Sequence, residues 1–289
     1  MMKRLCLLAL ILFVSCKSDT PTSYLYNVSK NDSELSKPIE GEWLSVHDEK
    51  GQTFEEFKEA KPILPSAERK TIYLKPIGDF NALQEQQIEL TRQYLEVFFQ
   101  LKVVVSSKIS NNIVPENKRR IGAENNEQLL ASYILDSVLV KQKPKNAIVM
   151  MGISSLDLYP SPEWNYVFGL ASFENKVGVT SIFRLQDQEL KQENFDLCLT
   201  RLLKISSHEI GHMFSLHHCI DANCVMNGTN NIPETDKNVS RLCSKCQRKL
   251  YSSIKYDNRK RLSELIQFFK KNHLNSELAI LEKDWENIN

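Results

Sequence analysis

The sequence predicts an α/β fold built on a mixed, mostly parallel sheet, and three observations support this prediction. Short apolar or β-branched segments alternate with amphipathic segments of helical period in the first half of the chain. Two later apolar segments are separated by a short polar turn, which predicts an antiparallel hairpin at the sheet edge. Two amphipathic segments near the C-terminus predict a helical extension.

Two of the helices have a candidate capping residue at their start. Asn81 is followed three positions later by Gln84, and Asn194 precedes a segment with apolar residues at helical spacing. The two C-terminal helices are expected to pack back onto the domain, with binding of a partner as the alternative. We expect strands over residues 71–76, 101–105, 147–151, 166–173 and 177–184, and helices from Asn81, over 126–140, from Asn194 and in two segments between 262 and 285.

Length and charge limit the classes of protein to consider. The 289 residues, of which 42% are hydrophobic, are enough for one domain with a sizeable core and additional segments. Lys and Arg number 37 against 36 Asp and Glu, so the chain lacks the basic excess typical of nucleic-acid binding. We expect no nucleic-acid partner, and we expect a monomer.

A short motif, His208-Glu209-Ile-Gly-His212, carries the strongest chemical signal. Side chains four apart share one face of a helix, so His208 and His212 can bind one metal ion while Glu209 lies about 100° around the axis. Glu209 is therefore placed to accept a proton from a metal-bound water rather than to bind the metal.

A catalytic zinc has three protein ligands and one open position, so a third ligand is needed. His218 is the candidate by its spacing, which His217 misses by one. A continued helix would turn His218 about 240° away from the metal. The helix is therefore expected to end near Ser215, so that the chain folds back.

Four cysteines that follow the histidines predict a second, structural zinc site. In an extended segment Cys219 points away from the side that His218 faces. With Cys224 and the C-x-x-C pair formed by Cys243 and Cys246, it completes a tetrahedral four-thiolate set. Two disulfides are the alternative, because an exported protein could form them.

The order of these ligands, with Met226 two residues after Cys224, resembles the archaemetzincins, a branch of the metzincin peptidases. The resemblance implies a metzincin-like zincin fold, peptide or protein substrates, a catalytic zinc whose bound water Glu209 activates, a structural zinc, and Met226 as the apolar floor beneath the catalytic metal. Ser215 stands where the long zinc-peptidase pattern has glycine. The alternative is a catalytically inactive zinc-binding lipoprotein that serves as a binding or scaffolding module.

The predicted edge strand offers a place for substrate. Extended peptides commonly add a strand to an exposed sheet edge, and metzincins bind substrate in this way above the metal. The candidate residues are Phe168, Gly169, Leu170 and Ala171; an ordinary edge strand is the alternative.

The N-terminus resembles a bacterial lipoprotein signal. A short basic start and an apolar stretch over residues 5–14, too short to span a bilayer, precede Ser15 and Cys16. Cys16 would carry the lipid, which would anchor the protein in the cell envelope on a bacterial membrane, facing the periplasm or the surface. An ordinary cleaved signal or a short membrane anchor is the alternative. We expect a signal over residues 1–16, a flexible tether over 17–40, a peptidase domain over 41–250 and a helical extension over 251–289.

Overall fold

The computed structural model describes residues 21–186 and 189–289, and it confirms the α/β class. The strands are β1 (Thr71–Ile77), β2 (Lys102–Val105), β3 (Arg119–Ile121), β4 (Glu127–Leu130), β5 (Ala147–Ser154), β6 (Asp157–Tyr159), β7 (Gly169–Ser172) and β8 (Val177–Ser181). The main sheet has the order β2-β1-β5-β8-β7. Only β7 is antiparallel to its neighbour in this sheet, as the predicted hairpin required.

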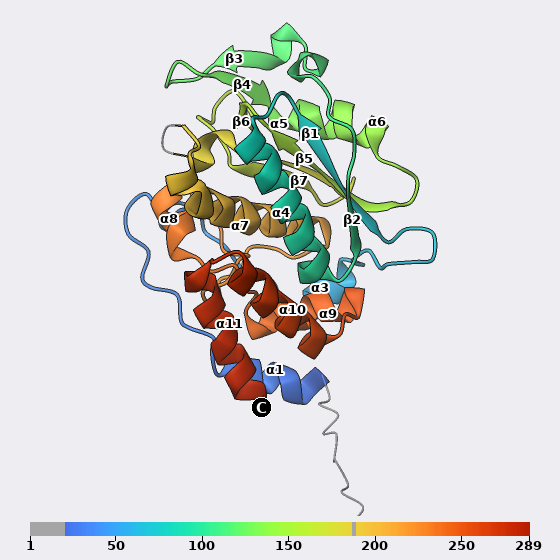
Figure 1. The fold of residues 1–289 in the computed structure, drawn as a ribbon, viewed down its shortest axis with the longest axis vertical. Helices are drawn as coiled ribbons and strands as arrows, with labels where there is room; N and C mark the ends of the chain where they lie inside the picture. Colours follow the sequence, from blue (N-terminus) through green and yellow to red (C-terminus); the bar gives the residue numbers. More distant parts are fainter. Residues whose placement is uncertain (1–20, 187–188) are drawn as a thin grey trace, which may run out of the picture.

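Helices cover both faces of the main sheet. The α-helices of the described residues are α1 (Pro21–Ser29), α2 (Trp43–Val46), α3 (Phe54–Glu59), α4 (Ala82–Phe99), α5 (Ala131–Tyr133), α6 (Val140–Gln142), α7 (Phe195–Met213), α8 (Ile232–Lys237), α9 (Ser244–Ile254), α10 (Asn258–Lys271) and α11 (Asn275–Ile288). Figure 1 shows α4 and α7 crossing the sheet, with α9, α10 and α11 below them. The larger core lies on this side, and a smaller one lies between the sheet and α5–α6. The site is built where α7 meets β7.

Local sequence patterns predicted α4 and the two C-terminal helices correctly. Asn81 and Gln84 form the reciprocal capping box at the start of α4. The two C-terminal helices, α10 and α11, pack against α4 and α1 respectively, as predicted. Asn194 precedes α7, but its side-chain oxygen accepts a hydrogen bond from the backbone N–H of Lys191 at 2.8 Å and not from an N–H of α7. The predicted side-chain cap was wrong, because a short 3₁₀ turn over Gln192–Asn194 uses the amide.

The helix predicted over residues 126–140 is wrong in its first turn. Residues 127–130 form β4, which pairs with β3 and β6 in a separate three-stranded sheet. Gln128 is buried there and donates to the Asp157 carboxylate at 2.7 Å. The helix begins at Ala131 and is π-helical over Ile134–Leu139. Pairing with the nearby strand β3 and with the later strand β6 outweighs the local helical pattern.

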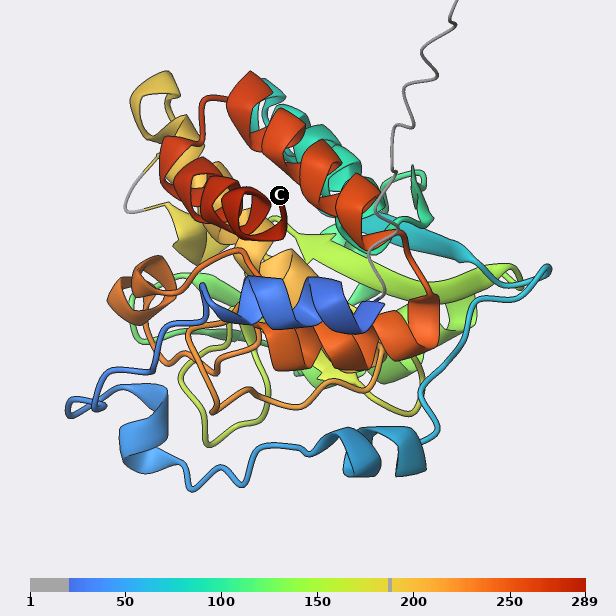
Figure 2. The ribbon, with the colours of Figure 1, turned by 90° about the horizontal axis from the view of Figure 1, so that it is seen from below.

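A flexible tether was predicted over residues 17–40, and part of this range, residues 21–29, is instead a packed helix. Residues 21–29 form α1, whose Tyr24 and Val28 are buried on one face. Figure 2 shows α1 lying across α9 beside α11. The guanidinium of Arg241 donates to the Val28 carbonyl at 2.7 Å and so ties α1 to the body.

The predicted lipid attachment site, Cys16, lies outside the described residues. Within residues 21–186 and 189–289, no helix combines the length and the apolar character needed to cross a membrane.

Candidate metal centres

The active-site helix α7 places two histidines on one face near its C-terminal end. Its opposite, apolar face is buried in the core through Leu199, Leu202 and Leu203. His208 and His212 lie one turn apart, and their Nε2 atoms are 2.9 Å from each other. The predicted two-point arrangement is therefore present in the structure.

The chain turns back at Ser215, where the sequence predicted the helix to end. Ser215 has φ +73°, in the left-handed region that glycine adopts without steric cost. The backbone N–H of Leu216 donates to the Gly211 carbonyl at 3.0 Å, which closes the helix. The Ser215 hydroxyl accepts a hydrogen bond from Lys176 Nζ at 3.2 Å. The serine thus makes the turn that the long zinc-peptidase pattern assigns to glycine.

The turn brings His218 to the two helical histidines. One ligand atom from each of His208, His212 and His218 lies within 4.8 Å of the others. His217 is exposed, and its ring packs edge-on against Phe173, with the ring centroids 5.3 Å apart. The spacing argument that preferred His218 over His217 therefore agrees with the geometry.

The hydrogen bonds of the two helical histidines determine which nitrogen of each ring is free to bind a metal. Nδ1 of His208 lies 2.8 Å from the Val225 carbonyl, and Nδ1 of His212 lies 2.7 Å from the Leu216 carbonyl. A carbonyl only accepts, so Nδ1 carries the proton in both rings and Nε2 presents a lone pair. Two lone pairs 2.9 Å apart repel each other unless a cation lies between them. The donor set therefore fits a metal ion held by Nε2 atoms.

Burial keeps both helical histidines neutral and ready to bind a metal. Burial, together with the neighbouring His218, lowers the pKa of His208 to about 3. Burial and the two other rings lower the pKa of His212 well below its usual value. Protons therefore compete weakly with a metal for these nitrogens at neutral pH.

Glu209 lies beside the histidines in a position sheltered from solvent. It is 6% exposed, and burial raises its pKa to about 8. Its carboxyl group packs against Gly169 of β7, where an added Cβ would lie 2.5 Å from Glu209 Oε1. A carboxyl group with a pKa near neutrality can both accept and donate a proton.

The four predicted cysteines form a second cluster. Their sulfur atoms lie within 4.8 Å of one another, and all four side chains are buried. The sulfurs of Cys219 and Cys243 are 3.7 Å apart, far beyond a disulfide bond and close to the ~3.8 Å edge of a tetrahedral zinc–thiolate site. All four are free thiols. The structure therefore favours the metal site over the alternative of two disulfides.

The electrostatics of the cysteine cluster also fit a cation. Hydrogen bonds from the other three thiols lower the pKa of Cys219, whereas burial raises the pKa of Cys224 well above its usual value. A cation bound among the four sulfurs would stabilise their thiolate forms against this burial. Because His218 and Cys219 are adjacent, the two clusters meet at one peptide bond, as the alternation of side chains predicted.

Met226 is fully buried against the active-site helix. An added Cβ on Gly211 would lie 2.5 Å from the Met226 sulfur, so this glycine allows the close approach. The Met226 carbonyl accepts a hydrogen bond from the Cys219 N–H at 2.8 Å, which links the chain at Met226 to the loop that carries His218. Its role as the apolar floor beneath a catalytic metal stays a prediction.

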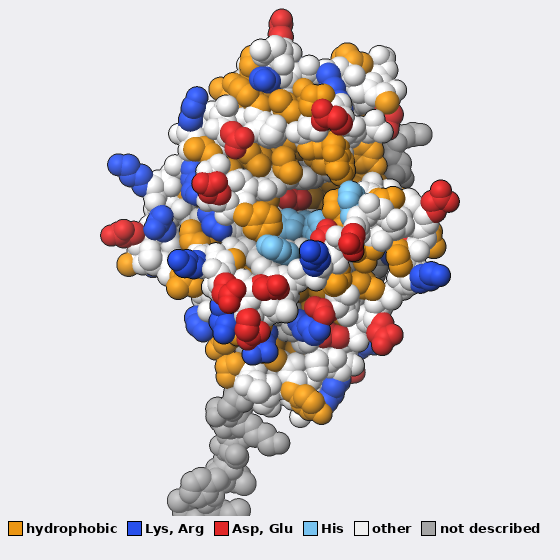
Figure 3. Space-filling model, turned by 180° about the vertical axis from the view of Figure 1, so that it is seen from behind, with side chains coloured by type: hydrophobic (Ala, Val, Ile, Leu, Met, Phe, Trp, Pro, Cys, Tyr) orange, Lys and Arg blue, Asp and Glu red, His pale blue; other side chains and the backbone are white. Residues whose placement is uncertain are grey.

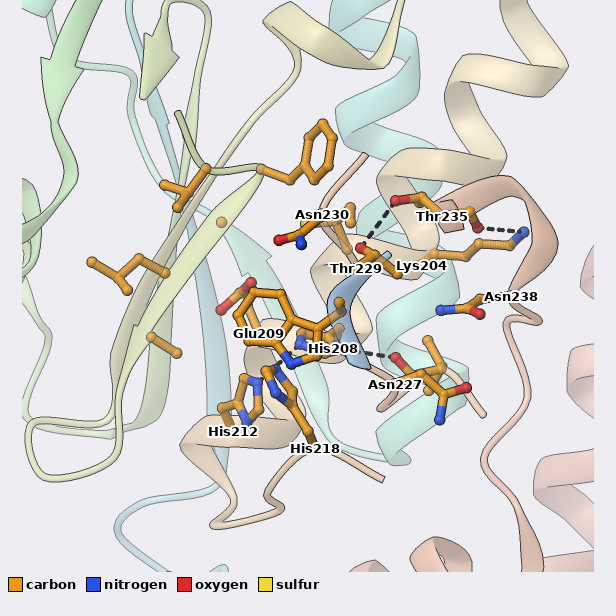
Figure 4. Close-up of a pocket in the computed structure, with 18 of the residues that line it drawn as sticks. Lys204, His208, Glu209, His212, His218, Asn227, Thr229, Asn230, Thr235 and Asn238 are labelled. Atoms are coloured by element: carbon orange, nitrogen blue, oxygen red, sulfur yellow. Dashed lines mark hydrogen bonds between the residues drawn. The ribbon is translucent and has the colours of Figure 1, made fainter. Parts of the chain in front are cut away.

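A cavity of about 480 Å³ opens above the histidines. Figure 3 shows the histidines in a hollow bordered by hydrophobic side chains. In Figure 4 the rings of His208, His212 and His218 converge, with Glu209 beside them. The predicted edge residues, Phe168, Gly169, Leu170 and Ala171, line the cavity, and β7 ends the main sheet in the order of the described strands.

Comparison with known proteins decides the family. A family model described as peptidase family M54 matches residues 89–252, more than half of the chain. The chain belongs to this family, the archaemetzincins. Archaemetzincin-2 of Rattus norvegicus is 30% identical over 271 residues, covering 82% of this chain and 75% of the rat protein. The archaemetzincin of Pyrococcus horikoshii is 38% identical over 133 residues, covering 46% of this chain and 70% of that protein.

A solved structure agrees with this assignment. The archaemetzincin of Methanopyrus kandleri matches with a TM-score of 0.54 and 26% identity, covering 67% of this chain and all of that one. As an archaemetzincin, the chain is a zinc metallopeptidase, a hydrolase that acts on peptides.

Sequence reasoning missed an archaemetzincin residue that contacts the metal centre. Glu49 accepts a hydrogen bond from Nδ1 of His218 at 2.6 Å and another from the Trp43 indole at 2.8 Å. Burial opposes its charge, but these two hydrogen bonds, together with the charges of His218 and His47, lower the pKa of Glu49. No local pattern could have found it, because Glu49 and His218 are 169 positions apart.

Proposed function

We propose that the chain hydrolyses peptide bonds at the three-histidine centre, with Glu209 as general base and with two zinc ions per chain. The observation that carries the proposal is the position of Glu209. Its carboxyl group is buried beside three converging histidines, at the wall of the cavity that would receive the substrate.

Each residue has a defined part in the proposed reaction. Zinc, when bound by His208, His212 and His218, supplies a Lewis acid that acidifies water and polarises the scissile carbonyl. Glu209 accepts the proton of the attacking water at its carboxylate and passes it to the leaving amine. The pKa of about 8 in the metal-free protein indicates that this carboxyl group holds a proton readily. Nearby positive charge would favour the ionised form that the first step requires.

The cysteine cluster supports a structural role for the second zinc. It joins the ligand loop, through Cys219 and Cys224, to the start of α9, through Cys243 and Cys246. A closed four-thiolate site leaves no position for substrate. Its proposed role is to fix the segment that carries His218.

The substrate is proposed to bind as an added strand beside β7. The residues Phe168, Gly169, Leu170 and Ala171 line the cavity on this side. Backbone hydrogen bonds along the edge would hold an extended peptide with its scissile bond over the histidines.

For localisation we propose a lipid anchor at Cys16 on a bacterial membrane, with a monomeric enzyme facing the periplasm or the surface. The described residues begin at Pro21, and residues 17–20 span at most about 14 Å. The enzyme would therefore lie close to the membrane. Labelling of the full chain with a fatty-acid analogue tests the anchor: label should enter the wild type and not Cys16→Ser, and equal labelling of both would contradict it.

The test of the catalytic proposal is Glu209→Ala. The variant should keep both zinc ions, because Glu209 is not among the converging ligands, and should lose about 100- to 10,000-fold in kcat. Metal content and hydrolysis of a mixed peptide library, with and without chelator, are the measurements. Undiminished turnover in the metal-replete variant would exclude Glu209 as the base. A wild type that holds two zinc ions but cleaves no peptide would favour the inactive binding module.

A further inference from the structure

The segment of residues 42–53, named here the N-terminal strap, lies along the ligand loop of residues 215–220. The strap precedes residues 89–252, which the family model matches. Gln52 is buried, and its amide donates to the Ser215 carbonyl at 3.0 Å and accepts the His217 N–H at 3.4 Å. Gly51 contacts Ile220 so closely that an added Cβ would lie 2.8 Å from its side chain. The strap therefore follows the loop over several residues.

Glu49 is the strap residue that reaches the metal centre. It accepts Nδ1–H of His218 at 2.6 Å, and the two side chains are only 25% and 19% exposed. The Trp43 indole donates to the same carboxylate oxygen, Oε1, and its ring packs edge-on against His218. Trp43 is itself fixed, because its backbone N–H donates to Glu234 at 2.9 Å. The carboxylate is thus held by two donors in one orientation.

The third histidine differs from the other two in its partner. His208 and His212 are rigidly placed by α7, and their Nδ1 atoms face backbone carbonyls. His218 lies in a loop beyond the turn at Ser215, so no helix fixes its ring. Among the three rings, only that of His218 has a carboxylate as the recorded partner of Nδ1.

We infer that Glu49 is a positioning residue of the catalytic metal centre, which holds His218 with Nε2 directed at the metal and strengthens this ligand with its negative charge. A carboxylate that accepts the second N–H of a ligating histidine fixes the tautomer and increases the basicity of the ring. The inference rests on the proposed function only in taking the three histidines as metal ligands.

The test is the metal affinity of the full chain. Glu49→Gln removes the charge while keeping the size of the side chain, and Glu49→Ala removes the acceptor as well. Asp48→Asn, which removes one charge from an exposed neighbour, is the matched control. Zinc affinity is measured by competition with a chromogenic chelator. Cobalt substitution gives separate spectra for the histidine centre and the four-thiolate site, so the latter is an internal reference.

Both Glu49 variants should lower the affinity of the histidine centre about 10- to 100-fold, with alanine the weaker binder. The four-thiolate spectrum and the Asp48→Asn control should match the wild type. Unchanged affinity in Glu49→Gln and Glu49→Ala would overturn the inference, and so would equal loss at both metal sites, which indicates a general loss of structure. A wild type that binds both metals but hydrolyses no peptide would contradict the proposed function and leave the role of Glu49 intact.

Discussion

At the scale of single residues, Ser215 shows how the centre tolerates a departure from glycine. A non-glycine residue in the left-handed region costs about 1–2 kcal/mol. The Ser215 hydroxyl and carbonyl are both bonded, to Lys176 and Gln52 respectively. Only the hydroxyl bond is specific to serine, because the backbone carbonyl would accept from Gln52 with glycine as well. A bond of this kind contributes about 0.5–1.5 kcal/mol, which offsets much of the strain. The third histidine therefore reaches the metal centre without glycine at this turn.

Gly169 is the residue whose replacement should affect the base most directly. In Gly169→Ala the new Cβ would lie 2.5 Å from Glu209 Oε1 and 2.7 Å from Glu209 Cγ and Cδ, so the carboxyl group must move. Because a displacement of about 1 Å can cost roughly 100-fold in rate, we expect kcat to fall by about that factor. Zinc content should stay unchanged. Steady-state kinetics and metal analysis test this expectation.

Gly178 provides the matched control, since it lies on β8, paired opposite Ala171 of β7. Its added Cβ would lie 3.1 Å from the flexible end of Met213 and 3.3 Å from the Leu170 carbonyl, so Gly178→Ala should reduce kcat far less. If the two variants have equal kcat, steric contact with Glu209 is not the reason that β7 has glycine at this position.

At the scale of elements, local sequence patterns predicted those parts of the fold that local forces determine. The start of α4 was predictable because Asn81 and Gln84 satisfy each other's backbone groups. The hairpin of β7 and β8 was predictable because a short polar turn fixes its pairing. Likewise, the spacing within α7 was sufficient to place His208 and His212 on one face.

Elements that depend on distant partners were not predictable in this way. β4 is a strand because it pairs with β6, whose Asp157 is 29 positions from Gln128, as well as with the nearby strand β3, although residues 127–130 continue a helical pattern. α1 is ordered because its two buried side chains meet α9 and α11, although the polar residues around them suggested a tether. Glu49 is a further example, because it contacts His218 only when the fold brings the N-terminal strap beside the ligand loop.

The attachment of α1 to the body depends on Arg241, which leads to a stability prediction. Its guanidinium pairs with Asp284 and Asp32 at 2.6 Å each, and the side chains of Arg241 and Asp284 are 3% and 1% exposed. Arg241→Gln leaves the Asp284 charge buried without its partner, which should cost about 3–5 kcal/mol of unfolding free energy. Denaturant unfolding at fixed zinc concentration measures the change.

Lys58→Gln is the control, because Lys58 pairs with Glu55 only at 3.8 Å and both side chains are exposed. It should unfold at nearly the wild-type denaturant concentration. A similarly small shift for Arg241→Gln would show that the buried pair does not hold α1 and α11 to the domain.

At the scale of the whole molecule, both ends of the described chain are built into the peptidase body. α11 pairs with the active-site helix through Glu277 and Lys204, which are 3.2 Å apart and buried. The N-terminal strap contacts the ligand loop from the other side of the sequence. The catalytic centre therefore depends on segments beyond the ligand motif, and the two clusters are coupled through the His218–Cys219 peptide bond.

We predict that a chelator removes the two zinc ions in a fixed order and that the two losses have different effects. The histidine centre opens to the cavity, whereas the four thiol groups are buried and closed. Increasing chelator should first remove one zinc per chain and abolish hydrolysis while the melting temperature changes little. Removal of the second zinc should then lower the melting temperature strongly, because four neighbouring thiolates lose the cation that binds them together and compensates their charge. Metal analysis, activity and thermal unfolding along one chelator titration test this order.

Unfolding on loss of the first zinc would show that the histidine centre, and not the cysteine cluster, stabilises the fold. Hydrolysis that continues after both zinc ions have been removed would exclude metal-dependent catalysis.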